Sequence, residues 1–222
     1  MLSLILAESS LELVPKELQH HNSVISHSKK LGKNPSEILL DNSWHYGAMK
    51  GIKNEIKRGR PDLVHISLLE ACSIPLYYNK KITIFVHTID NKVIFLGDDV
   101  HLPKSYHRFA GLIEKLFSEK IIEAEGKKLL EIKNMSFDEL LGVINPKRVI
   151  GLSTQGVRSS CEDVAKKLTD DSCLVIGSFP KGHFSDEIKK RFEYIVSVDD
   201  ITLESHIVIS RVLYEYEKTI FM

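Results

Sequence analysis

From Lys147 onward, short apolar runs alternate with helical patterns, and this alternation constrains the fold more than any other feature of the chain. The strand-type runs lie at 148–156, 172–178 and 193–198, and the helical patterns lie at 161–168, 185–192 and 202–221. Strands that alternate with helices predict a mainly parallel sheet flanked by helices. We therefore expect an α/β fold.

The earlier part of the chain extends the pattern. We expect a buried strand at 2–7, a helix from Pro15 to Gly32, a short strand at 38–40, a helix at 43–58 and a buried strand at 60–71. The chain has 222 residues, 43% of them hydrophobic, which is enough for one substantial core. We therefore interpret 1–222 as a single domain.

The middle of the chain carries a hairpin signal. The β-rich runs ITIFVHT and KVIFLG flank the turn dipeptide Asp90-Asn91. We interpret this hairpin as a β-rich insertion on the α/β core, at approximately 76–101. After it, Pro103 begins a helix at 104–120 with an apolar stripe, and the charged segment 127–132 is expected to be exposed.

Charge and cysteine content narrow the class of protein. Lys plus Arg and Asp plus Glu number 30 each, so a nucleic-acid surface would have to be a local patch. Cys72, Cys161 and Cys173 are odd in number and widely spaced, which predicts neither a disulfide framework nor a zinc site. We expect a reducing, cytoplasmic location. The opening MLSLILAESS lacks a basic start and is typical of a first strand rather than a signal peptide, and no stretch predicts a membrane span.

Loops rich in Gly, Ser, Thr or Asp follow the strands of the C-terminal part, at 152–156, 177–182 and 197–205. Ligands of parallel sheets bind at the carboxyl ends of strands, so these loops are expected to form one pocket. Gly177 and Gly182 have the glycine separation of a phosphate loop, but His183 and Phe184 stand where Lys and a hydroxyl are needed. For any single loop, a simple connecting turn remains an equal alternative.

Four segments together resemble a known family. They are GSFPKGHFSDEI, VDDITLESHIVISRVLYEYE, GRPDLVH and LPKSYHRFAGL, and in order they are similar to the archaeal form of the SPOUT-class pseudouridine N1-specific methyltransferases of small-subunit ribosomal RNA. The resemblance implies S-adenosyl-L-methionine as cofactor, a C-terminal trefoil knot at about 147–222, a homodimer and a part in ribosome biogenesis. It covers almost the whole chain.

The resemblance also implies site residues. The matched cofactor-binding positions are Gly177, Gly182, Ile201, Thr202, Leu203, Glu204, Ser205, His206, Leu152 and Thr154, with Ser153 beside them. His206 has two open readings, as a residue on the ligand side or as one packed beneath the site. The matched glycines would let main chain approach a nucleoside and a methionine moiety. The apolar last helix is a candidate dimer interface, with burial in the core as the alternative.

The RNA-binding expectation rests on two segments. Arg60 follows a turn glycine, and Asp62 is placed to orient its guanidinium for phosphate or base edges. In the helix after Pro103, cationic positions fall on one face at helical spacing, ending in a glycine that would let an RNA backbone lie close. These positions are Lys104, His107, Arg108 and Gly111. An ordinary surface ion pair and an ordinary solvated face are the alternatives.

The expected chemistry is N1-methylation of a pseudouridine in small-subunit rRNA. No residue of the sequence declares itself as a general base, since Asp62, the nearest acidic candidate, is expected to serve Arg60. The histidines show no ligand spacing, so no metal site is expected. Trp44 and Tyr46 are interpreted as packing or interface residues, although an aromatic ring could stack on a flipped base. Two alternatives remain: a non-catalytic rRNA-binding assembly factor, and a SPOUT enzyme that acts on another RNA base.

Overall fold

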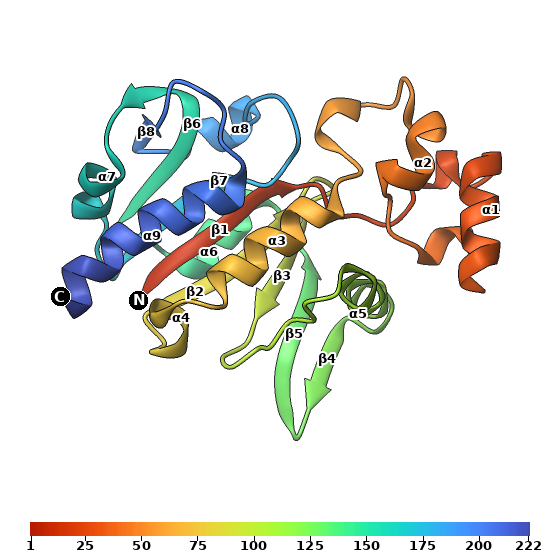
Figure 1. The fold of residues 1–222 in the computed structure, drawn as a ribbon, viewed down its shortest axis with the longest axis horizontal. Helices are drawn as coiled ribbons and strands as arrows, with labels where there is room; N and C mark the ends of the chain where they lie inside the picture. Colours follow the sequence, from red (N-terminus) through yellow and green to blue (C-terminus); the bar gives the residue numbers. More distant parts are fainter.

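A computed structural model describes residues 1–222, built on one eight-stranded sheet (Figure 1). The strands are β1 Leu2–Ser9, β2 Ile82–Thr88, β3 Lys92–Leu96, β4 Ile121–Ala124, β5 Lys127–Asn134, β6 Arg148–Arg158, β7 Ser172–Gly177 and β8 Tyr194–Ser197. They lie in the order β4-β5-β3-β2-β1-β7-β6-β8. The neighbours in the part of the sheet ordered β2-β1-β7-β6-β8 pair parallel. The neighbours in the part ordered β4-β5-β3-β2 pair antiparallel. The prediction of an α/β fold with a mainly parallel sheet is confirmed.

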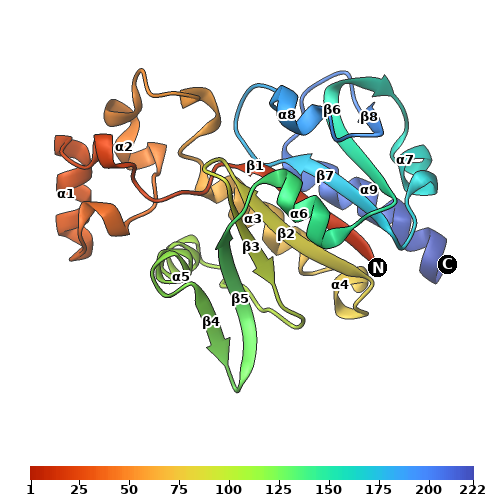
Figure 2. The ribbon, with the colours of Figure 1, turned by 180° about the vertical axis from the view of Figure 1, so that it is seen from behind.

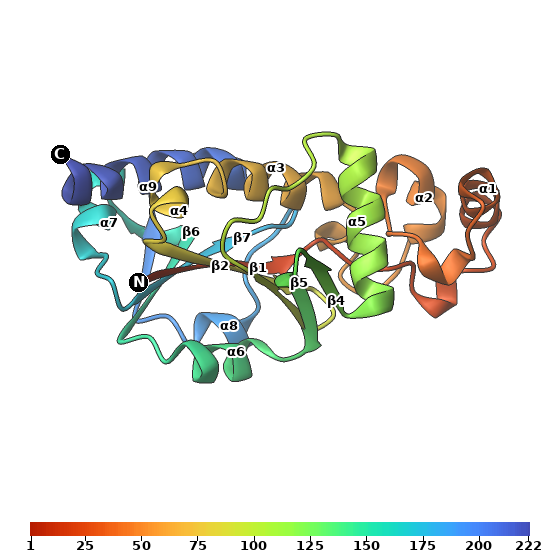
Figure 3. The ribbon, with the colours of Figure 1, turned by 90° about the horizontal axis from the view of Figure 1, so that it is seen from below.

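Helices cover both faces of the sheet. They are α1 Asn22–Leu31, α2 Asn42–Met49, α3 Pro61–Ala71, α4 Pro75–Tyr78, α5 Tyr106–Glu119, α6 Phe137–Ile144, α7 Cys161–Lys167, α8 Asp186–Lys189 and α9 Ser205–Phe221. Figure 3 shows α3, α4 and α9 on one face of the sheet and α6 and α8 on the other. In Figure 2 the face that carries α6 is turned toward the reader. The result is a three-layer arrangement. No helix is both long and apolar enough to span a bilayer.

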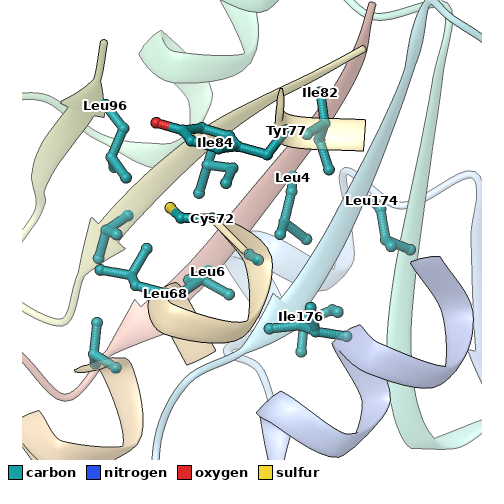
Figure 4. Close-up of a cluster of buried hydrophobic side chains, with 14 of the residues drawn as sticks. Leu4, Leu6, Leu68, Cys72, Tyr77, Ile82, Ile84, Leu96, Leu174 and Ile176 are labelled. Carbon is teal, nitrogen blue, oxygen red and sulfur yellow. The ribbon is translucent and has the colours of Figure 1, made fainter. Parts of the chain in front are cut away.

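The main core lies between the sheet and the layer that contains α3 and α9. Leu4, Leu6 and Ile84 extend from β1 and β2 toward Leu68 of α3 and Cys72 at its C-cap, as Figure 4 shows. A second, smaller cluster under α6 and α8 contains Phe137, Leu140, Phe184 and Ile188. Both faces of β1 and β7 are buried, and the middle of each strand is apolar, at 4–7 in β1 and 173–176 in β7.

Helices α1 and α2 form a separate small cluster beside α5 (Figure 3). Polar contacts attach this part of the chain to α5. The Tyr106 hydroxyl donates to Asp41 Oδ2 at 2.5 Å, and Lys33 forms an ion pair with Glu114. Glu114 Oε1 also accepts the backbone N–H of Leu39 at 2.9 Å. The N-terminal ends of α2 and α5 are therefore held side by side.

The predicted hairpin is present, but it is not set apart from the core. β2 and β3 pair antiparallel around Asp90 and Asn91, and Asn91 has the positive φ of a tight turn. β2 also pairs directly with β1, in the middle of the sheet. The segment interpreted as an insertion at 76–101 therefore continues the main sheet.

The segment 60–71 is a helix, not the buried strand expected from its sequence. Its residues are apolar on several faces, so periodicity alone does not separate a buried strand from a buried helix. Pro61 occupies the first helical position, where its fixed φ favours the helix and its missing N–H costs nothing. The sequence feature that indicated a helix was Pro61 directly after Arg60, because proline is common at the first position of a helix.

Three shorter predictions were also wrong. Residues 38–40 make only an isolated bridge, between Leu39 and Leu13. The helix predicted at 43–58 ends at Met49, because Lys50 has a ψ of 122° and Gly51 a φ of 81°. The segment 127–132 belongs to β5, in which Leu130 and Ile132 are buried and the charged residues between and around them face outward. That alternation is the pattern of a half-buried strand.

Candidate functional site

A cavity of about 520 Å³ lies at the carboxyl ends of β6, β7 and β8. Its walls come from the three loops that the sequence singled out, at 152–154, 176–184 and 197–205, with Leu63 of α3 and Val208 of α9 added. Parallel pairing of β6 with β7 and β8 places these strand ends at one edge of the sheet. The three loops therefore line one cavity, as the sequence predicted.

The floor of the cavity is apolar. Leu152 and Ile176 at the ends of β6 and β7 are buried, as are Leu63 and Val208. Phe179 lines the cavity beside Phe184, with ring centroids 5.8 Å apart and the rings at 87°. A floor of this kind suits a flat, weakly polar ring system.

The rim is polar and is held by short-range hydrogen bonds. Asp199 Oδ1 accepts the backbone N–H of Asp200 at 2.8 Å and that of Ile201 at 3.4 Å. The Ser197 hydroxyl donates to the carbonyl oxygen of Asp199 at 2.7 Å. At the start of α9, the Ser205 and Ser67 hydroxyl oxygens lie 2.6 Å apart. These contacts fix the loop before α9 and bring the carboxylates of Asp199 and Glu204 to the cavity wall.

The two glycines of the second loop have different reasons to be glycine. Gly182 has a φ of 97°, which residues other than glycine rarely adopt. A Cβ at Gly177 would lie 2.7 Å from the Phe179 ring, so this glycine lets the ring pack against the loop. Both glycines line the cavity wall.

The second loop is anchored from behind by residues that the sequence analysis did not identify. Lys57 Nζ lies 2.7 Å from Glu8 Oε2, with both side chains nearly buried, and it also lies 4.7 Å from the centre of the Phe179 ring. The Glu8 carboxylate also accepts the backbone N–H of Ser185 at 3.3 Å. Glu8 has a positive φ of 47° at the end of β1. Only the unusual LAESS opening marked this position, and its partner lies 49 residues away.

Arg60 and Asp62 make the expected fork. Arg60 Nε and Nη2 donate to the two carboxylate oxygens of Asp62, each at 2.8 Å. These hydrogen bonds raise the pKa of Arg60, and the guanidinium stays about one-third exposed. The backbone N–H of Arg60 donates to the Ser10 hydroxyl at 2.7 Å, so the residue is fixed at the start of α3. Sequence reasoning placed the pair at a helix-to-strand turn; in the structure it lies at the start of a helix, with Arg60 at the N-cap position of α3 and Asp62 in its first turn.

The cationic positions near α5 are accessible, but only His107, Arg108 and Gly111 lie on the helix, since α5 begins at Tyr106 and Lys104 precedes it. Lys104, His107 and Arg108 are exposed, and Gly111 leaves open space beside its Cα. Below them His65 Nε2 contacts the carbonyl oxygen of Pro103 at 2.7 Å, and its ring stacks on Phe109. His65 thus joins α3 to the start of α5, while Leu63 on α3 faces the cavity. The first turns of α3 therefore lie between the cavity and the cationic face of α5.

Most of the predicted residues are brought together, with one exception among the cofactor positions. All those positions except His206 line the cavity. His206 is half-buried beneath the rim, and its Nδ1 is buried without a hydrogen-bond partner. Additional wall residues, Phe179, Phe184 and Asp199 among them, were not singled out by sequence, although Phe179 and Asp199 lay within the predicted loops.

Two further expectations concern surfaces. The candidate interface residues of the last helix were Ile207, Val208, Ile209, Val212 and Leu213. The last four are buried in the core of the single chain, so they are not free to form a dimer interface, whereas Ile207 is half-buried. The alternative reading, burial in the core, is the one that the structure has. No group of three or more His, Cys, Asp or Glu side chains is arranged to hold a metal ion.

Comparison with known proteins adds a family and a bound molecule. The model of a family described as EMG1/NEP1 methyltransferase matches residues 4–217. The chain is 39% identical over 219 residues to a Ribosomal RNA small subunit methyltransferase Nep1 of Thermococcus sibiricus, covering 98% of each chain. It is 40% identical over 214 residues to the protein of the same name from Staphylothermus marinus, covering 96% of this chain and 93% of that one.

The fold has a close solved counterpart. The crystal structure of Archaeoglobus fulgidus Nep1 bound to S-adenosylhomocysteine superposes with a TM-score of 0.87, at 35% identity and with 97% of each chain covered. The likeness therefore extends over the sheet, both helix layers and the loops around the cavity.

Proposed function

Because this chain belongs to the EMG1/NEP1 methyltransferase family, it is an S-adenosylmethionine-dependent methyltransferase of small-subunit ribosomal RNA, and we propose that its target atom is N1 of a pseudouridine. The observation that carries this proposal is the cavity at the ends of β6, β7 and β8, formed by the loops whose sequences match the family.

The cavity fits the methyl donor in size and in chemistry. Its volume of about 520 Å³ is within the usual range for a small-molecule site. The apolar floor offers a place for adenine, and the loops around Gly182 offer main-chain groups to the ribose and the amino acid part. The carboxylates of Asp199 and Glu204 complement a ligand that carries positive charge. Bound there, S-adenosylmethionine supplies an activated methyl group on a sulfonium.

Pseudouridine has the reactive position that this chemistry needs. Its base is joined to ribose through carbon, so N1 carries a hydrogen that uridine lacks. Transfer forms an N1–methyl bond, breaks the sulfur–methyl bond and releases the N1 proton. Holding the two reactants in line supplies much of the acceleration. Asp62 is engaged by Arg60 through both oxygens, which supports its role as an orienting residue and leaves water as the proton acceptor in this proposal.

Arg60 and the cationic face of α5 are proposed to hold the RNA. The forked guanidinium suits a phosphate or a base edge, and the exposed Lys104, His107 and Arg108 suit the backbone. Because α3 lies between this face and the cavity, RNA bound there could direct one unstacked base toward the methyl donor.

The remaining expectations of the family resemblance are part of the same proposal. We propose that the chain from about 147 to 222 is threaded as a trefoil knot, that the protein is a homodimer and that it works in the cytoplasm with ribosomal assembly proteins. In support of a homodimer, Val157 and Ile201 are apolar and 78% and 66% exposed, which offers one surface for the interface. The free thiols of all three cysteines suit a reducing compartment.

Methyl transfer to matched RNA hairpins tests the proposal. Two hairpins that differ only in carrying pseudouridine or uridine are incubated with labelled S-adenosylmethionine. Transfer to the pseudouridine hairpin alone is the expected result. Transfer to both hairpins would mean that another atom is the target, and tight RNA binding with transfer to neither would favour the assembly-factor alternative.

A further inference from the structure

Helix α2 presents two aromatic side chains that neither the core nor the cofactor site uses. Trp44 is 46% exposed and Tyr46 is 65% exposed. Each has a lysine above its ring: Lys30 Nζ lies 5.2 Å from the Trp44 ring centre, and Lys50 Nζ lies 5.7 Å from that of Tyr46. Exposed aromatic rings with adjacent cations are the elements from which proteins build surfaces for single-stranded nucleic acid.

The Trp44 ring is supported from behind. The His27 ring stacks on it, with centroids 4.5 Å apart and planes at 12°. His27 Nδ1 lies 3.0 Å from Nε2 of His45, which is fully buried. His45 Nδ1 in turn accepts the backbone N–H of Asp41 at 3.1 Å. His45 therefore carries its proton on Nε2 and donates to His27, which fixes the ring that supports the indole.

This supported indole lies next to the surface already proposed for RNA. Asp41, which precedes α2, accepts the hydroxyl of Tyr106 at the first position of α5. Lys104, His107 and Arg108 surround that end of α5. The two carboxylates that act on the His27 ring are hydrogen-bonded: Asp41 to the Tyr106 hydroxyl and the backbone N–H of Ser43, and Glu114 to Lys33 and the backbone N–H of Leu39. Lys33 compensates the charge of Glu114, whereas Asp41 keeps its negative charge and is outnumbered by the cations Lys30, Lys104 and Arg108.

We propose that Trp44, supported by His27 and flanked by Lys30, stacks on an unpaired base of single-stranded RNA that flanks the target nucleotide. The inference rests on the proposed function, since it extends the RNA surface of the same enzyme from α5 to α2. Lys30, whose Nζ lies 5.2 Å from the Trp44 ring centre, contacts a phosphate beside the stacked base. The site binds unpaired RNA with little sequence preference, because every base has a face to stack.

The chain carries a single tryptophan, so Trp44 emission reports this site directly. The full-length protein is titrated with two hairpins that carry the same pseudouridine, one blunt and one with short single-stranded oligoadenylate extensions. The extended hairpin is expected to quench Trp44 emission and to bind about tenfold more tightly than the blunt one. Trp44→Ala is expected to abolish that preference, and Trp44→Phe to retain most of it, because a phenyl ring also stacks.

Tyr214→Ala is the matched control. Tyr214 is 54% exposed with Lys218 Nζ 5.4 Å from its ring centre, but it lies on α9, away from α5. This variant is expected to keep the preference for the extended hairpin. Affinity for S-adenosylhomocysteine verifies that each variant is folded.

Two kinds of result would overturn the inference. One is an equal affinity of the unsubstituted protein for both hairpins, or a preference that survives Trp44→Ala. The other is Trp44 emission that changes with protein concentration in the absence of RNA, which would identify α2 as an interface between copies of the chain. Methyl transfer to the blunt hairpin by the unsubstituted protein tests the proposed function separately, so the two failures are distinguishable.

Discussion

At the scale of single residues, the fork of Arg60 on Asp62 separates RNA binding from cofactor binding. Arg60→Ala removes a cation outside the cavity wall and leaves the three loops intact. We expect RNA affinity to fall about tenfold or more, since a charge-assisted contact contributes about 1.5–3 kcal/mol. Binding titrations with hairpin RNA and with S-adenosylhomocysteine measure the two affinities.

Arg191 supplies a matched control for that substitution. It makes a similar fork on Asp138, on the α6 and α8 side of the sheet. Arg191→Ala is expected to leave RNA affinity unchanged. Equal loss of both affinities in Arg60→Ala would indicate misfolding and remove the role given to Arg60.

Gly182 tests the cofactor side. Alanine at a φ of 97° is strained by about 1–3 kcal/mol, although the nearest atoms would leave room for its methyl group. We expect Gly182→Ala to weaken S-adenosylhomocysteine binding about tenfold through reshaping of the loop, with RNA affinity retained. Calorimetric titration measures the first, and Gly111→Ala, at a helical position with open space, is the control for added bulk. Unchanged cofactor affinity in Gly182→Ala would show that the loop tolerates the strain.

At the scale of elements, the packing of α1 on α2 depends on a neutral histidine. Burial lowers the pKa of His45 from 6.5 to about 4, and burial also lowers the pKa of His27. As pH falls, His45 is protonated in the unfolded chain at a higher pH than in the folded protein. The free energy of unfolding is therefore expected to fall as pH falls from about 6.5 toward 4. The loss attributable to this group is on the order of 3 kcal/mol.

Urea unfolding across that pH range checks the prediction. His45→Asn keeps an acceptor for the Asp41 N–H but cannot be protonated, so its stability should depend less on pH than that of the unsubstituted protein. The same pH slope in both proteins would mean that other groups, not His45, set the acid limit.

At the scale of the whole molecule, the region of Val157 and Ile201 is one surface available for self-association. Val208, Ile209, Val212 and Leu213 of the last helix are buried in its own core, whereas Val157 is 78% exposed at the end of β6. We expect Val157→Asp to convert the proposed homodimer to a monomer, because an unpaired charge in an apolar interface is costly. Sedimentation velocity measures the oligomeric state. Val143→Asp, at an exposed valine of α6, should leave it unchanged, and a dimer that survives Val157→Asp would place the interface elsewhere.

The sequence alone determined the features that are local in the chain. The alternation after Lys147 predicted the parallel part of the sheet, because side-chain periodicity reports the faces that each element buries. Gly177 and Gly182, and the loops that follow β6, β7 and β8, predicted the position of the cavity, since parallel strands end at one edge. The spacing of Arg60 and Asp62 was short enough for their fork to be predicted.

Only the tertiary structure decided the features that join distant residues. The segment 60–71 is apolar on several faces, so its sequence pattern does not distinguish a helix from a strand. Its packing between the sheet, α5 and α9 decides that it is a helix. The contact of Lys57 with Glu8 and the support of Trp44 by His27 and His45 join positions separated by 17 to 49 residues. Such pairs leave no periodic signal, because their geometry is created by the path of the chain between them.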